Sequence, residues 1–125
     1  MELTIDELKA LTYPQVTDPT TFNAPIGASA FGQSVIVRSR DSGVWIGTLA
    51  RVIGADVTLD RARRVWSWRG AAELTQLARD GVNHSHADTR IGVTAPVVHV
   101  FGICEIIPAS EACVASVEKV TEWTK

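Results

Sequence analysis

The sequence has only two cysteines and no long apolar run. Cys104 and Cys113 are nine residues apart and form no CxxC pair. Since no secretory segment is visible, both are expected to be reduced, small, buried residues of an intracellular protein. Residues 1–8 are acidic and lack an apolar core of signal-peptide length, and no later segment is long enough to cross a bilayer. These absences predict a cytoplasmic protein without membrane contact.

Lysine is also scarce. None lies between Lys9 and Lys119, whereas all nine arginines lie between Arg38 and Arg90, together with six acidic residues. This window carries a formal surplus of three positive charges, although the whole chain has a formal net charge of −2, which argues against a general binder of DNA or RNA. Arginine binds phosphate with two parallel hydrogen bonds, so the cluster favours a small anionic ligand. A compositional bias of the source would give the same pattern.

Sequence motifs of catalysis are missing as well. There is no P-loop and no GxGxxG. Cys104 lies in an apolar segment without a neighbour that would activate its thiol. His84, His86 and Asp88 could bind a metal if their segment were extended, but a surface loop without metal is favoured. His99 is expected to be a hydrogen-bonded interior or interface residue. We therefore expect no enzyme activity and no cofactor.

The most informative feature that is present is the segment 62–71, Ala-Arg-Arg-Val-Trp-Ser-Trp-Arg-Gly-Ala. Its alternation predicts a strand, with Arg64, Trp66 and Trp68 on one face and the intervening residues on the other. A guanidinium beside two indoles suits a ligand that combines phosphate with a planar base. The alternative is that both tryptophans are core residues covered by arginine stems. The sequence leaves both interpretations open.

The N-terminal part of the sequence predicts a helix followed by an arm. Thr4 and Glu7 form a capping-box pattern for a helix over residues 4–11. Residues 12–32 contain three prolines and several apolar side chains, which predicts an arm along its own domain or a neighbouring subunit. We therefore divide the chain into a helix and Pro-rich arm over residues 1–32 and a β-barrel-like domain over residues 33–125.

The remaining pattern predicts an α+β fold, a small antiparallel β-barrel or twisted sheet with two or three short helices. Strands are expected over residues 34–39, 44–53, 56–59 and 63–68, with turns at 41–43 and 54–55. A helix over residues 71–79, capped by Gly81, should precede an exposed loop over 81–95. A long and possibly central strand is expected over residues 97–107, and a last helix after Ser110, through Val117.

The chain resembles a family of small phage-encoded proteins over about two-thirds of its length. The residues that carry the resemblance are, in order, Val35-Ile36-Val37-Arg38, Gly43-Val44-Trp45-Ile46-Gly47-Thr48-Leu49, the segment 62–71, Leu74-Thr75-Gln76-Leu77-Ala78-Arg79-Asp80-Gly81 and, after a weaker stretch, Glu105-Ile106-Ile107-Pro108 and Ser110-Glu111. The Arg-Arg-x-Trp-x-Trp-x-Gly-Ala run is the specific part of this resemblance.

The same outline is similar to the Thoeris anti-defence proteins. These are homo-oligomeric sponges that capture cyclic ADP-ribose-type and cyclic oligonucleotide immune signals without cleaving them. The resemblance implies a pocket between subunits, with arginines on phosphates and aromatic rings on adenine. The positions that match are Arg38, Arg63, Arg64, Trp66 and Trp68. Relatives tend to have Lys-Phe where this chain has Arg90-Ile91, so one aromatic ring is missing there, and Arg90 is taken as a further candidate ligand-binding residue.

The sequence thus predicts a phage anti-defence sponge for a cyclic nucleotide-type signal in the host cytoplasm. A single small domain cannot enclose such a ligand, so self-association is expected, as a dimer-based tetramer or hexamer, through the arm, Trp45 and Trp123. One alternative is a small β-barrel that binds single-stranded nucleic acid or inhibits a host nuclease, although nucleic acid is not the expected partner. Another is a structural or virion-associated protein without a ligand.

Overall fold

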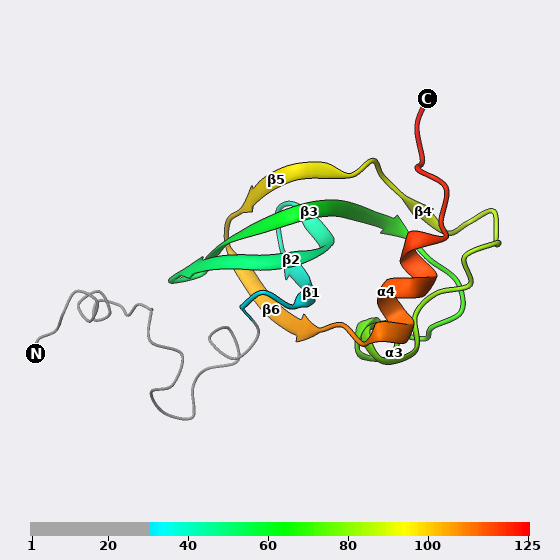
Figure 1. Cartoon of the computed structure of the whole chain (residues 1–125), viewed down its shortest axis with the longest axis horizontal. Helices are drawn as coiled ribbons and strands as arrows, with labels where there is room; N and C mark the ends of the chain where they lie inside the picture. The colour runs from blue at the N-terminus through cyan, green and yellow to red at the C-terminus, as the bar shows by residue number, and fades with distance from the viewer. Residues whose placement is uncertain (1–30) are drawn as a thin grey trace, which may run out of the picture.

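The computed structural model describes residues 31–125 of the chain (Figure 1). The predicted helix over residues 4–11, and the predicted arm up to residue 30, lie outside the described residues. The elements follow in the order β1 (Ser34–Ser39), β2 (Gly43–Ile53), β3 (Asp56–Ser67), α3 (Leu74–Asp80), β4 (Arg90–Ile91), β5 (Ala95–Val100), β6 (Ile103–Pro108) and α4 (Glu111–Glu118).

The strands form one antiparallel sheet in the order β4-β3-β2-β1-β6, in which β5 pairs with β3 farther along the same edge as β4. Only Phe101 and Gly102 separate β5 from β6, although β6 pairs with β1 at the opposite edge of the sheet. So short a link requires the sheet to curl strongly, as Figure 1 shows. Since β5 and β6 are not paired within the described residues, the sheet stays open. The predicted α+β fold, in its twisted-sheet form, is confirmed.

Two hairpins at the start of the sheet have the predicted turns. Ser39 pairs with Gly43 across the first turn, and Ile53 pairs with Asp56 across the turn at residues 54–55. Gly43 and Gly54 have φ values of 80° and 59°, which glycine adopts without steric cost. These glycines therefore fix where β2 begins and ends.

Strand β3 corrects one prediction, because the strands expected over residues 56–59 and 63–68 form a single strand, Asp56–Ser67. Thr48 pairs with Asp60 and Ile46 with Arg63, so β3 holds one residue more than β2 between these pairs. The extra residue forms a β-bulge next to Arg61, whose φ of 50° lies in the left-handed region. A bulge of one residue reverses the alternation of side chains beyond it.

The predicted strand over residues 97–107 is also corrected. It is divided into β5 and β6, because Gly102 turns the chain with a φ of 69°. Neither strand is central, since each pairs with only one other strand of the sheet. The predicted loop over residues 81–95 contains the short strand β4, whose Ile91 is fully buried.

Two separate cores stabilise the domain. The helical core lies between the sheet and the two helices, and comprises Ile36, Ile46, Val65, Leu77, Ala78, Val82, Ile91, Cys113, Val117 and Val120. The strand core draws only on strands, and comprises Val35, Val37, Leu49, Val57, Leu59, Ala62 and Val100. Alternating residues of β1 serve the two cores in turn, as expected for a sheet that is covered on both faces.

Side-chain caps begin both helices, which pack together at one end of the sheet (Figure 1). The Glu73 carboxylate accepts hydrogen bonds from the amides of Thr75 and Gln76, and these bonds lower the pKa of Glu73. Helix α4 begins after Ser110, as predicted, and the Ser110 hydroxyl accepts from the Cys113 amide. Neither helix in residues 31–125 has the length and apolar character that a bilayer crossing demands.

Candidate ligand-binding site

The end of β3 does not keep the alternation that its sequence predicts. Val65 pairs with Ile91 and Ser67 with Arg90, so Trp66 is an extra residue on β3 and forms a second bulge. Beyond it, Trp68 packs against the helical core, on the same side as Val65, and its indole Nε1 donates to the Ala71 carbonyl at 3.1 Å. The prediction that Trp68 shares a face with Arg64 and Trp66 is therefore wrong.

Arg64 nevertheless lies beside two indoles, because Trp45 takes the place expected of Trp68. The guanidinium carbon of Arg64 is 4.1 Å from the ring centroid of Trp66 and 5.5 Å from that of Trp45. Trp45 is the register partner of Arg64 on β2, and its Nε1 donates to the Ser42 carbonyl at 3.1 Å, which fixes the ring. These cation–π contacts hold the guanidinium in one position.

Arg64 keeps its hydrogen-bond donors unused toward the part of the chain that the structure describes. Within residues 31–125 its side chain makes no hydrogen bond and no ion pair, although the ring contacts orient it. A Cβ atom on Gly43 would be in ordinary van der Waals contact with Nη2 of Arg64, at 3.5 Å, so the guanidinium lies against the start of β2. An oriented guanidinium with unused donors is prepared to bind an anion with two parallel hydrogen bonds.

The C-terminal tail extends this site. The amide of Trp123 donates to the Ile91 carbonyl at 2.8 Å, and its ring meets Trp66 edge to face, with centroids 5.8 Å apart. The guanidinium of Arg90 lies 5.7 Å from the Trp123 ring, and Trp66 and Trp123 are 51% and 47% exposed. The aromatic–arginine patch, as we call it, thus comprises Trp45, Arg64, Trp66, Arg90 and Trp123.

Arg63 has a different environment from the residue that follows it. It is 8% exposed, and its guanidinium donates to four backbone carbonyls at 2.8 to 3.1 Å, those of Ile91, Gly92, Val117 and Val120. Burial lowers the pKa of Arg63, while the carboxylate of Glu122 acts in the opposite direction. Because these carbonyls occupy its donors, the structure gives Arg63 a structural position, away from the ligand-binding role that the resemblance implies.

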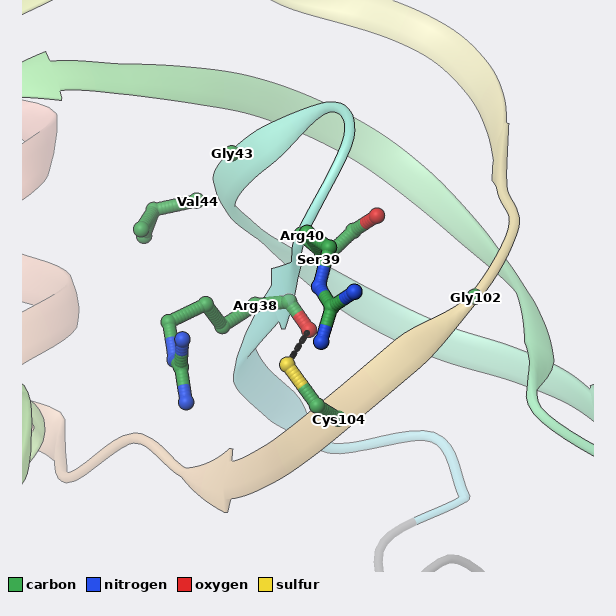
Figure 2. A pocket seen from close by; sticks show the side chains of 7 residues that line it. All are labelled: Arg38, Ser39, Arg40, Gly43, Val44, Gly102 and Cys104. Carbon is green, nitrogen blue, oxygen red and sulfur yellow. Dashed lines mark hydrogen bonds between the residues drawn. The ribbon is translucent and has the colours of Figure 1, made fainter.

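Arg38 lies outside the patch, on β1. Its Nε donates to the Glu105 carboxylate at 2.7 Å, and this hydrogen bond raises the pKa of Arg38. Together with Arg40 and Cys104, Arg38 lines a cavity at the turn between β1 and β2 (Figure 2). Of the six predicted ligand-binding residues, the structure therefore brings together Arg64, Trp66 and Arg90.

The remaining polar candidates show no catalytic arrangement. The His86 Nδ1 accepts from the Asp88 amide at 3.0 Å, and no group of three metal-binding side chains comes together in residues 31–125. His99 is hydrogen-bonded to the Thr58 hydroxyl at 2.9 Å, as expected, but on the surface. Cys104 is exposed rather than buried, which corrects its prediction, because it lies at the bulge of an edge strand. Cys113 is buried as predicted, and burial raises its pKa to about 11.

Comparison with known proteins identifies a family but no activity. The family model described as "Domain of unknown function (DUF6948)" matches residues 32–117, which include both helical caps, both bulges of β3 and most of the patch. No curated protein and no solved structure matches the chain.

Proposed function

We propose that this chain, which belongs to the DUF6948 family, is a non-catalytic binding protein that captures a small cyclic nucleotide-type signal. The observation that carries the proposal is the state of Arg64, whose guanidinium is oriented by two indoles while its donors remain unused within the described residues. Most exposed arginines must lose side-chain entropy before they bind an anion. The two indoles have already restricted the side chain of Arg64, so less side-chain entropy is lost when it binds a phosphate and the binding free energy is more favourable.

The patch also supplies what a base requires. Trp66 and Trp123 present about half of their surfaces to solvent, next to the anion site. Stacking of a base on an aromatic ring contributes about 1 to 3 kcal/mol. A ligand that joins phosphate to a planar heterocycle can therefore use Arg64 and the indoles at once, whereas a simple anion can use only Arg64.

The composition of the patch supports capture without cleavage. It consists of tryptophan and arginine, and neither serves as a nucleophile or general base at neutral pH. Binding requires only these contacts in a fixed arrangement. Together with the resemblance to Thoeris anti-defence sponges, this supports a role as a phage anti-defence protein that sequesters an immune signal in the host cytoplasm.

Self-association is part of the proposal, because the patch lies on the surface of a single small domain. Exposed apolar side chains lie on and beside β5, where Val93, Val97 and Phe101 are 52%, 51% and 66% exposed. Apolar groups so placed favour contact with another protein surface. A homo-oligomer built from dimers, a tetramer or hexamer, would cover this strand and close the ligand site with a second copy.

Calorimetric titration of the full chain with cyclic ADP-ribose, cyclic di-AMP and cyclic tri-AMP tests the proposal. We expect at least one of them to bind, and Arg64→Met to weaken it by about 100-fold, the equivalent of losing a bidentate charged contact. Arg51→Met is the matched control, because Arg51 is exposed and lies outside the patch. No heat from any cyclic ligand, together with tight binding of a short oligonucleotide, would establish the nucleic-acid alternative instead.

Release of the ligand by heat separates capture from catalysis. After binding, the protein is denatured and the supernatant is analysed by mass spectrometry for intact ligand. A sponge returns the ligand unchanged and in stoichiometric amount. Recovery of a hydrolysed product only would overturn the non-catalytic role, whatever the affinity.

A further inference from the structure

A cavity of about 400 Å³ lies where α4 meets the sheet. Ile46 lines it and belongs to the helical core, and Arg63, the register partner of Ile46, lines it as well. Trp45, which pairs with Arg64, packs against the strand core instead. Because successive residues of a strand point to opposite faces, the cavity lies on the other face of the sheet from Arg64 and its indoles. Its main walls are Thr48, Arg61 and Arg63 on the sheet, and Val114, Val117 and Glu118 on α4.

The bulge of β3 brings Arg61 into the lining of this cavity. The strands approach closely there, since a Cβ atom on Gly47 would lie 3.1 Å from the carbonyl oxygen of Asp60. Arg61 has a φ of 50°, a conformation that costs most residues free energy and that glycine adopts freely. Its Nη2 donates to the Thr48 hydroxyl at 3.1 Å, and its other nitrogens make no hydrogen bond within residues 31–125. An arginine at a position that suits glycine indicates a use for the side chain.

The two walls of the cavity carry charges of opposite sign. On the sheet, Arg63 is buried and Arg61 is exposed, and neither forms an ion pair within the residues that the structure describes. On the helix, Glu118 is exposed and likewise forms no ion pair there. It is the last residue of α4, where the helix dipole adds partial negative charge. Arg61 and Glu118 line one cavity without pairing with each other, so each can bind a separate group of one ligand.

The cavity also has an apolar part. Ile46 and Val117 are 6% and 4% exposed, and Val114 is half-buried. A volume of about 400 Å³ falls in the range of small-molecule sites. The carboxylate of Glu118 would repel a phosphate dianion, which makes this cavity unsuitable for a second nucleotide. Separated charges of both signs, together with apolar side chains, match a small zwitterion that has an aliphatic group.

We propose that this cavity binds a free aliphatic α-amino acid such as leucine. The carboxylate of the amino acid accepts hydrogen bonds from Arg61, its ammonium group donates to Glu118, and its side chain lies on the apolar part of the lining. Arg63 adds positive charge to the sheet wall but no hydrogen bond to the ligand, because it donates to backbone carbonyls. This site goes beyond the proposed function and does not depend on it, since Arg64 lies on the other face of the sheet.

The role of each charge is tested by removing it from the ligand. The isotope-labelled full chain is titrated and followed by NMR with leucine, with isocaproate, which lacks the amino group, and with isoamylamine, which lacks the carboxylate. We expect leucine to shift the backbone amides of Thr48, Thr94 and Val114 saturably, because these residues line the cavity. Each analogue should bind at least about 10-fold more weakly, the equivalent of one charged contact. If leucine shifts none of these amides, or if either analogue binds as tightly as leucine, the proposal is overturned.

Variants assign the two charged contacts. Arg61→Gly removes the guanidinium at a φ that suits glycine, so the variant should fold, which thermal unfolding checks. It should weaken leucine by about 10-fold without weakening isoamylamine, and Arg61→Met should do the same. Glu118→Gln should weaken leucine similarly without weakening isocaproate. Arg51→Met is the matched control and should leave leucine binding unchanged, because Arg51 is exposed and does not line the cavity. An affinity for leucine that Arg61→Gly and Glu118→Gln both leave unchanged would also overturn the proposal.

Discussion

Arg63 and Arg64 are adjacent in the sequence, yet they belong to opposite environments. Arg63 lies beneath α4 and uses its guanidinium to satisfy four backbone carbonyls. Arg64 lies among indoles on the outer side and satisfies no group within the described residues. The same side chain thus stabilises the fold at one position and is available to a ligand at the next.

The difference shows how a strand can separate stability from binding. The carbonyls to which Arg63 donates lie at the end of α4 and around β4. Those of Ile91 and Val117 also accept from the backbone amides of Trp123 and Val120, so Arg63 adds a second hydrogen bond to each. Arginine can satisfy all four with one planar group, and it stays charged even when burial lowers its pKa. This anchoring holds β3 in place, and the exposed face of β3 is free to carry chemistry that contributes little to stability.

The largest expected effect that tests this comparison is the loss of Arg63. Arg63→Met removes four hydrogen bonds, including those to the carbonyls of Gly92 and Val120, and should lower the free energy of unfolding by about 3 to 5 kcal/mol. Arg64→Met, by contrast, removes only exposed cation–π contacts, worth about 1 kcal/mol. Urea denaturation of both variants gives the two values. Equal losses in the two variants would contradict the division of roles.

Trp66 and Trp68 should also differ in how much they contribute to the free energy of unfolding. We expect the loss of Trp68 to cost more than the loss of Trp66, with a smaller difference than between Arg63 and Arg64. Trp68→Ala leaves a void against the helical core and frees the Ala71 carbonyl, at a cost of about 3 kcal/mol. Trp66→Ala removes a ring that is half exposed, and should cost about 1 kcal/mol in stability while it removes the stacking surface. Thermal unfolding and ligand titration of each variant measure both effects. A Trp66 variant that unfolds as easily as the Trp68 variant would place Trp66 in the core.

Most of the fold could be predicted from turn residues and periodicity. Glycines at turns located both hairpins, and Ser110 located the start of α4, because these signals act within a few residues. Bulges were not predictable in this way. Nothing in the local sequence shows that Arg61 or Trp66 would be an extra residue, since a bulge depends on the register of the partner strand.

The bulges are also why only some of the predicted site residues lie together. Strict alternation predicts that Trp68 lies on the same face of the strand as Arg64. The bulge at Trp66 instead turns Trp68 toward the helices. Trp45 and Trp123 were expected at subunit contacts, and their place beside Arg64 and Trp66 depends on contacts distant in sequence. Counting back from the turn at residues 54–55 in strict register already pairs Trp45 with Arg64, because the bulge on β2 between Leu49 and Arg51 cancels the one on β3.

The two cysteines give a third comparison between a buried and an exposed position, Cys113 and Cys104. The expected effect on the free energy of unfolding is the smallest of the three. Burial raises the pKa of Cys113 to about 11, above its ordinary value of 9.0, so the folded protein keeps this proton where the unfolded chain releases it. The stability from this group is therefore complete below about pH 9 and is lost as the pH rises toward 11, by about 2 kcal/mol. Urea denaturation between pH 8 and 11 measures the loss, and Cys113→Ala should reduce the pH dependence, whereas Cys104→Ala should leave it unchanged. An identical pH dependence in both variants would show that the helical core admits a charged thiolate. The contrast between buried Cys113 and exposed Cys104 would then not hold.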